Sequence, residues 1–86
     1  MYRIVLLPEA AKFYRRIFVY NRDVFDRIDS VLNTLKTNPF LGKPLKDRLK
    51  GKYSLRVGVY RIIYSIEKQE LIIYILDIGH RREIYR

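Results

Sequence analysis

The stretch SLRVGVYRIIY, residues 54–64, decides the fold because it reads as two strands joined by a tight turn. Polar and apolar side chains alternate on both sides of Gly58, which permits the turn. If the larger apolar set faces the core, Arg56 and Arg61 lie together on the opposite, open face of the sheet. That core set is Tyr53, Leu55, Val57, Tyr60, Ile62, Tyr64 and Ile66.

A polar turn, residues 67–70, leads into LIIYILDI, residues 71–78, which is apolar on both faces, as in a central strand. Simple alternation turns four of its residues toward the core: Ile72, Tyr74, Leu76 and Ile78. It places Ile73, Ile75, Asp77 and, if the strand continues, Arg81 on the open face. Together with Ile63, these isoleucines expose more apolar area than a monomer usually leaves to water. The sequence leaves open whether a partner, the C-terminal segment or a helix covers it.

The N-terminal half reads as one strand and two helices. YRIVLL, residues 2–7, is β-branched and aromatic, and Pro8 ends this strand. A first helix follows from Glu9, with apolar residues at helical spacing: Ala10, Phe13, Ile17 and Tyr20. Asn21 is the expected N-cap of a second helix, which ends near Thr37 because residue 38 precedes a proline. Its apolar stripe is Val24, Ile28, Val31, Leu32 and Leu35.

These elements predict a single α+β domain, residues 1–86, with the order β-α-α-β-β-β. We expect an antiparallel sheet that combines a C-terminal three-stranded meander with the N-terminal strand. The helical hairpin then packs on one face of this sheet.

Charge indicates the kind of partner. Eighteen Lys and Arg against nine Asp and Glu give a net charge of +9, which attracts a polyanion. Five of the cations fall in the glycine- and proline-containing segment 40–52, which we expect to be a basic loop. Nucleic acid, an acidic protein segment and an anionic membrane all fit this charge, and aromatic residues among the cations favour nucleic acid.

Other residue types narrow the chemistry. Cysteine is absent, which excludes disulfides and the usual structural zinc sites. The apolar run before Pro8 is too short for a signal peptide or a membrane span, so we expect a cytoplasmic protein. Asp23, Asp26 and Asp29 read as a solvated helix stripe, and only Asp77 and Glu83 lie near the basic face, which argues against a metal-dependent nuclease.

The order of elements, the arginine-bearing SLRVGVYRIIY and the closing GHRREIYR, residues 79–86, closely resemble the RelE/ParE toxin superfamily, especially its RelE-like branch. The resemblance implies the toxin of a type II toxin–antitoxin pair. Such a toxin enters the ribosome and cleaves messenger RNA, using the RNA's own 2′-hydroxyl as nucleophile, and so inhibits translation. It implies a cognate antitoxin, the ribosome and messenger RNA as partners, and neither a metal nor a cofactor.

The resemblance also implies roles for residues. Arg61 and Arg81 become the catalytic arginines that stabilise the transition state and the leaving group, and Tyr85 becomes a candidate base or stacking residue. His80 is a possible acid or base. The implied RNA-binding residues are Lys50, Lys52, Arg56 and Arg82. RelE-like proteins tend to have a second lysine where this chain has Ser54, so Lys50 or Lys52 takes over that role.

Two alternatives stay open. The ParE-like branch binds DNA gyrase and cleaves nothing, although its members generally lack the arginine and tyrosine set seen in GHRREIYR. An inactive RNA-binding relic is suggested by Ser54, which supplies no charge. In the favoured reading, Arg61 and Arg81 share one face of the sheet.

Overall fold

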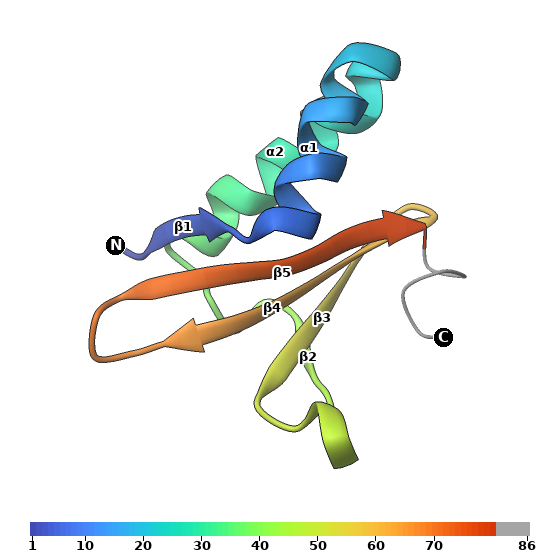
Figure 1. Ribbon diagram of the computed structural model, residues 1–86. Helices are drawn as coiled ribbons and strands as arrows, with labels where there is room; N and C mark the ends of the chain where they lie inside the picture. Colours follow the sequence, from blue (N-terminus) through green and yellow to red (C-terminus); the bar gives the residue numbers. More distant parts are fainter. Residues whose placement is uncertain (81–86) are drawn as a thin grey trace.

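The computed structural model describes residues 1–80, which form a mixed sheet with two helices on one side (Figure 1). The strands are β1 (Arg3–Leu6), β2 (Lys43–Pro44), β3 (Lys52–Val57), β4 (Tyr60–Glu67) and β5 (Ile72–His80). The helices are α1 (Pro8–Tyr20) and α2 (Arg22–Leu35), and a short 3-10 turn, η1 (Asp47–Leu49), precedes β3. The strand order is β1-β5-β4-β3-β2. The predicted α+β fold is therefore confirmed.

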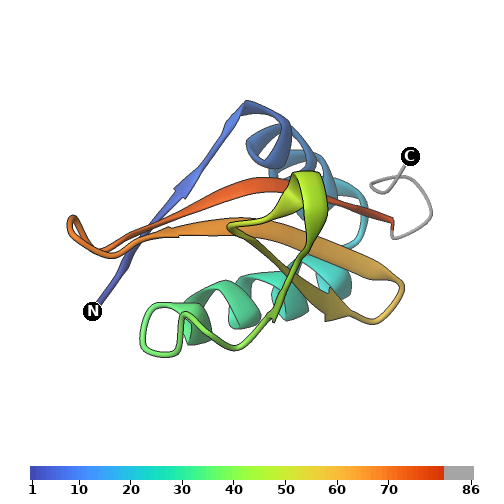
Figure 2. The same cartoon turned by 90° about the horizontal axis from the view of Figure 1, so that it is seen from below.

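The sheet differs from the prediction in two strands. β1 lies beside β5, although the two come from opposite ends of the described chain (Figures 1 and 2), and it pairs with β5 in parallel. Alternation in a sequence indicates faces and not strand direction, so an antiparallel pair was wrongly expected here. The segment expected to be a basic loop contains β2, which pairs with β3. Two residues are too few to produce a recognisable alternation.

A bulge in β5 changes which of its side chains reach the core. Ile63 pairs with Asp77, whereas the next residue, Tyr64, pairs with Ile75. Leu76 is therefore an extra residue on β5, and side-chain alternation reverses there. Ile73 and Ile75 are both 0% exposed and lie in the core, against the prediction that put them on the open face. The residues that alternate with them, Ile72 and Tyr74, take the open-face positions instead.

The other side chains of β5 also follow a different alternation before and after this bulge. Beyond it, Ile78 pairs with the core residue Ile62, as predicted. Asp77 pairs with Ile63, but its side chain lines a groove beside Glu9 of α1, so its predicted place on the open face is not confirmed. Before the bulge, Ile72 pairs with Glu67 on the open face, so its predicted inward position was wrong. Tyr74 was also wrongly placed, because it pairs with Ser65 on that face.

The helices pack on the other face of the sheet. Residues of both helices and three strands form the main apolar core: Ala10, Ile28, Leu32, Leu35, Val57, Ile62, Tyr64, Ile73, Ile75 and Ile78. The predicted N-cap is confirmed, because the Asn21 side chain accepts a hydrogen bond from the Val24 N–H (3.2 Å). Tyr20 ends α1 and is 79% exposed, so it lies outside the apolar face to which it was assigned. No helix within residues 1–80 is long and apolar enough to cross a membrane.

Candidate nucleic-acid interface

The open face of the sheet, opposite the helices, carries the two arginines of the central hairpin. Arg56 and Arg61 pair directly across β3 and β4, so their predicted adjacency on this face is confirmed. The turn between them begins at Gly58, whose φ of 62° suits glycine. On the other side of Arg61, its partner on β5 is Gly79, which has no side chain. Arg61 therefore has no side chain directly opposite it on β5.

Each arginine donates a hydrogen bond to a neutral oxygen. Arg61 Nη1 donates to Ser54 Oγ (3.0 Å), and Arg56 Nε donates to the Gly58 carbonyl oxygen (3.2 Å). These two bonds orient the side chains without removing their positive charges. Ser54 is only 5% exposed, so its contact with Arg61 is sheltered from water. The serine thus helps to hold the arginine in place.

A groove of about 420 Å³ opens on this side of the molecule. It is lined by Leu41, Gly42, Lys43, Pro44, Ser54, Leu55, Arg56 and Arg61. Among the described residues, every ionisable side chain in this lining is a cation. Lys43 was not singled out from the sequence. The only sequence signal for it was its position in the basic segment before β3.

Tyr64 attaches the segment before β2 to the sheet. Its buried hydroxyl donates to the Pro39 carbonyl oxygen (2.8 Å) and accepts a hydrogen bond from the Gly42 N–H (2.8 Å). Burial raises the pKa of the Tyr64 phenol, although the Gly42 N–H partly opposes this shift. The phenol therefore keeps its proton at neutral pH and remains able to donate. Through these two bonds, a core side chain positions one wall of the groove.

The predicted RNA-binding lysines occupy different positions. Lys52 is half-buried on β3 and pairs with Ser65, so it lies on the same face as Ser54 and Arg56. Lys50 is exposed just after η1, in the connection between β2 and β3. Lys52 is therefore part of the open face itself, whereas Lys50 lies in the loop that leads into it.

His80 lies on the opposite side of the sheet from Arg61. It pairs with Tyr60, and the two rings meet edge to face with centroids 6.1 Å apart. The structure therefore brings Arg56 and Arg61 together but does not bring His80 to them. Arg81, Arg82 and Tyr85 lie outside the described residues, so their places in the site stay predictions.

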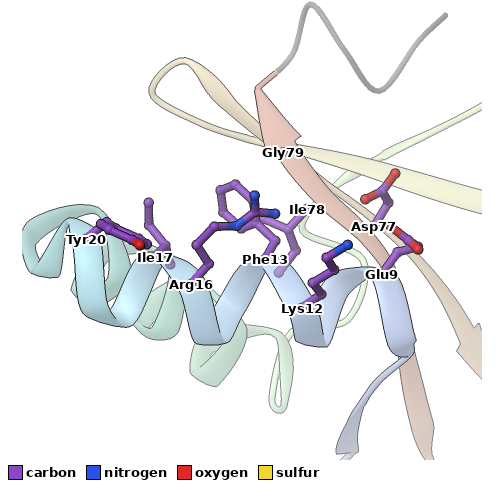
Figure 3. Close-up of a pocket in the computed structure, with 9 residues that line it drawn as sticks. All are labelled: Glu9, Lys12, Phe13, Arg16, Ile17, Tyr20, Asp77, Ile78 and Gly79. Atoms are coloured by element: carbon purple, nitrogen blue, oxygen red, sulfur yellow. The ribbon is translucent and has the colours of Figure 1, made fainter.

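A second groove, of about 460 Å³, runs between α1 and the end of β5 (Figure 3). Figure 3 shows the carboxylates of Glu9 and Asp77 near each other at one end, with Lys12 beside them. Burial and, to a lesser degree, the charge of Glu9 raise the pKa of Asp77. Among residues 1–80, no three side chains of the metal-binding types gather into a possible metal site.

Comparison with known proteins places a chain of this fold in a class of small proteins, the toxins of type II toxin–antitoxin systems. Residues 4–85 match the family described as ParE toxin of the type II toxin–antitoxin system parDE. The chain belongs to this family, within the RelE/ParE superfamily that its sequence resembles.

Three relatives show where the chain lies in that superfamily. Toxin RelG of Mycobacterium tuberculosis is 44% identical over 46 residues, which are 54% of this chain and 53% of RelG. Toxin RelE of the same organism is 38% identical over 60 residues, 69% of this chain and 62% of that toxin. The chain therefore spans about half to three fifths of these relatives. The crystal structure of the M. tuberculosis toxin–antitoxin complex RelBE2 is similar at 26% identity and a TM-score of 0.80, covering 93% of this chain and 98% of the other.

Proposed function

We propose that this type II toxin cleaves messenger RNA on the ribosome, without a metal, by attack of the RNA's 2′-hydroxyl on the adjacent phosphate. The observation that carries the proposal is the direct pairing of Arg56 with Arg61 on the open face. Like charges opposite each other destabilise a sheet. A negatively charged ligand between or beside them removes this cost. Two relatives named as the toxins RelG and RelE support the RelE-like choice.

The chemistry suits arginine. Attack of the 2′-oxygen on phosphorus adds negative charge to the phosphoryl oxygens, and the 5′-oxygen leaves to give a 2′,3′-cyclic phosphate and a 5′-hydroxyl end. Guanidinium groups bind such oxygens through two parallel N–H donors. A donor fixed in advance stabilises the transition state without having to reorganise. The Ser54 contact gives Arg61 this property, and Arg81 is the proposed second catalytic arginine.

Proton transfer needs a base near the 2′-hydroxyl. Tyrosine and lysine have ordinary pKa values near 10, and neighbouring cations lower them. In this proposal Tyr85 is the first candidate, and Lys52 on the open face is the second. The ribosome contributes by holding the message in a reactive geometry. His80 is the least favoured of the proposed acids and bases because it lies on the other face.

The proposal includes two macromolecular partners. RelBE2 is a toxin–antitoxin complex, and its likeness to this chain supports a cognate antitoxin here. We expect that antitoxin to cover the basic open face, and so to compete with RNA. The toxin acts in the cytoplasm, where it meets ribosomes.

Primer extension on a defined ribosome-bound message tests the activity. We expect new 5′ ends within the ribosome-protected segment, and no cut at that position in a message with a single 2′-deoxynucleotide there. Cutting of the deoxy-substituted message would contradict attack by the 2′-hydroxyl. Intact messages together with induced DNA breaks would instead favour a gyrase inhibitor, the second candidate, which the ParE name of the matching family favours. Binding of RNA without any cut would indicate an inactive relic.

A further inference from the structure

Lys43 lies beside the position where Arg61 is held. In the antiparallel pair of β2 and β3, Lys43 is directly opposite Ser54. Side chains of directly opposed residues lie on the same face of a sheet. The Ser54 hydroxyl is on the open face, since it accepts the hydrogen bond from Arg61. Lys43 therefore lies on one side of Ser54 and the Arg61 guanidinium approaches from the other.

The backbone that carries Lys43 is fixed on both sides. Before it, the Gly42 N–H donates to the Tyr64 hydroxyl (2.8 Å). After it, the Leu45 N–H donates to the Lys52 carbonyl oxygen (2.9 Å). Gly42 is packed so closely that an added Cβ would lie 2.7 Å from the Tyr64 hydroxyl oxygen. A two-residue strand therefore holds its lysine more firmly than an ordinary loop would.

The surroundings of Lys43 suit an anionic ligand. The lysine is exposed, and the groove that it lines contains two other ionisable side chains, Arg56 and Arg61. Within residues 1–80, this lining contains no carboxylate. An ammonium on a flexible stem contacts a phosphate as a compact charge, which complements the planar fork of an arginine. Phosphate contacts of this kind fix the position of a nucleic acid without reading its bases.

We propose that Lys43 is a phosphate-contacting residue of the RNA groove, and that Tyr64 and Gly42 are positioning residues for it. The ligand is the phosphodiester backbone of single-stranded RNA, an identity that rests on the proposed function. Lys43 holds the backbone next to the phosphate that Arg61 contacts. This phosphate contact does not depend on the base sequence of the RNA.

The test is the affinity of the purified full chain for oligouridine, measured at several salt concentrations. The logarithm of the binding constant falls against the logarithm of salt concentration by about 0.7 for each phosphate contact on a single strand. Lys43→Ala should make this slope shallower by about that amount, and Lys43→Arg, which keeps the charge, should restore it. Lys46→Ala is the matched control, because it removes a lysine of the same segment that does not line the groove.

Tyr64→Phe tests the positioning role. It removes both hydrogen bonds to the segment before Lys43, and should shift the slope toward that of Lys43→Ala while circular dichroism shows the sheet to be retained. A wild-type slope for Lys43→Ala would overturn the proposal, as would equal loss in Lys46→Ala. If the wild type binds RNA but never cuts it, the proposed activity fails while the slopes still decide the role of Lys43.

Discussion

At the scale of single residues, the Arg61–Ser54 hydrogen bond (3.0 Å) is the contact that links the fold to the proposed chemistry. RelE-like proteins tend to have a lysine at the position of Ser54, and the sequence alone made the serine look like a lost charge. In the structure, the buried Ser54 hydroxyl instead accepts a hydrogen bond from Arg61, a candidate catalytic residue. The sequence did not predict this hydrogen bond, because Ser54 and Arg61 lie on different strands and their contact depends on the register of the hairpin.

Ser54→Ala should therefore impair cleavage without unfolding the protein. Loss of one hydrogen bond to a charged group costs about 1.5–3 kcal/mol of stability, whereas a misplaced catalytic group can lower the rate by up to about 100-fold. Single-turnover cleavage of a ribosome-bound message and chemical denaturation measure the two effects. Ser65→Ala is the control, since Ser65 lies on the same face but opposite Lys52. Equal cleavage by both variants would show that Ser54 does not position Arg61.

Tyr14 offers a residue-scale test of the helical hairpin. Its hydroxyl donates to Asp29 Oδ1 (2.6 Å), and burial, together with this bond, raises the pKa of Tyr14 to about 12. Folded protein then holds a proton that unfolded protein releases near pH 10. The stability that the protonated Tyr14 hydroxyl contributes is complete below pH 10 and is lost as the pH rises toward 12.

Unfolding free energies of the wild type and Tyr14→Phe should thus converge between about pH 10 and 12. At neutral pH we expect the variant to be less stable by about 1.5–3 kcal/mol, because the bond is made to an aspartate. Tyr20→Phe is the control, since Tyr20 is 79% exposed. A constant difference across this pH range would contradict the assigned role of the Tyr14 proton.

At the scale of elements, local signals predicted some parts of the fold and missed others. The second helix was predictable because its cap and apolar stripe lie within the element itself, as Asn21 and Ile28 show. The bulge at Leu76 was not, because one extra residue in an apolar strand leaves no local mark. It moved Ile73 and Ile75 from the open face to the core. In exchange, Ile72 and Tyr74 lie on the open face, where simple alternation had not placed them.

The segment before β2 is held against the sheet by a close approach of the Gly42 backbone to Tyr64 and Ser54. A Cβ on Gly42 would lie 2.7 Å from the Tyr64 hydroxyl oxygen and 2.9 Å from the Ser54 carbonyl oxygen. Gly42→Ala should cost about 1–3 kcal/mol, as overpacking does, and should weaken RNA binding.

A double-mutant cycle separates the two clashes. Tyr64→Phe removes the hydroxyl, so Gly42→Ala should cost less in that background than in the wild type. Chemical denaturation of the four proteins gives the coupling. Strictly additive losses would mean that the hydroxyl does not hold Gly42 in place.

At the scale of the whole molecule, the sheet separates two tasks. One face carries the helices and the apolar core, and the other carries Lys52, Arg56 and Arg61. The net charge of +9 predicted a polyanionic partner, but only the strand register shows which face presents the cations at the groove. The arginine pair was predictable from the hairpin pattern. The role of Lys43 was not predictable. Its position depends on the hydrogen bond from the neighbouring Gly42 N–H to the Tyr64 hydroxyl, which joins residues far apart in the chain.

The most direct test of this account is the single-turnover rate of cleavage of a ribosome-bound message by the wild type and Arg61→Ala. Removal of one fixed donor to a developing anion lowers a rate by about two to three orders of magnitude, and we predict a loss of this size. Arg22→Ala is the matched control, because it removes an arginine from α2, away from the open face. Cleavage by folded Arg61→Ala at the wild-type rate would contradict the proposal that this face carries the chemistry.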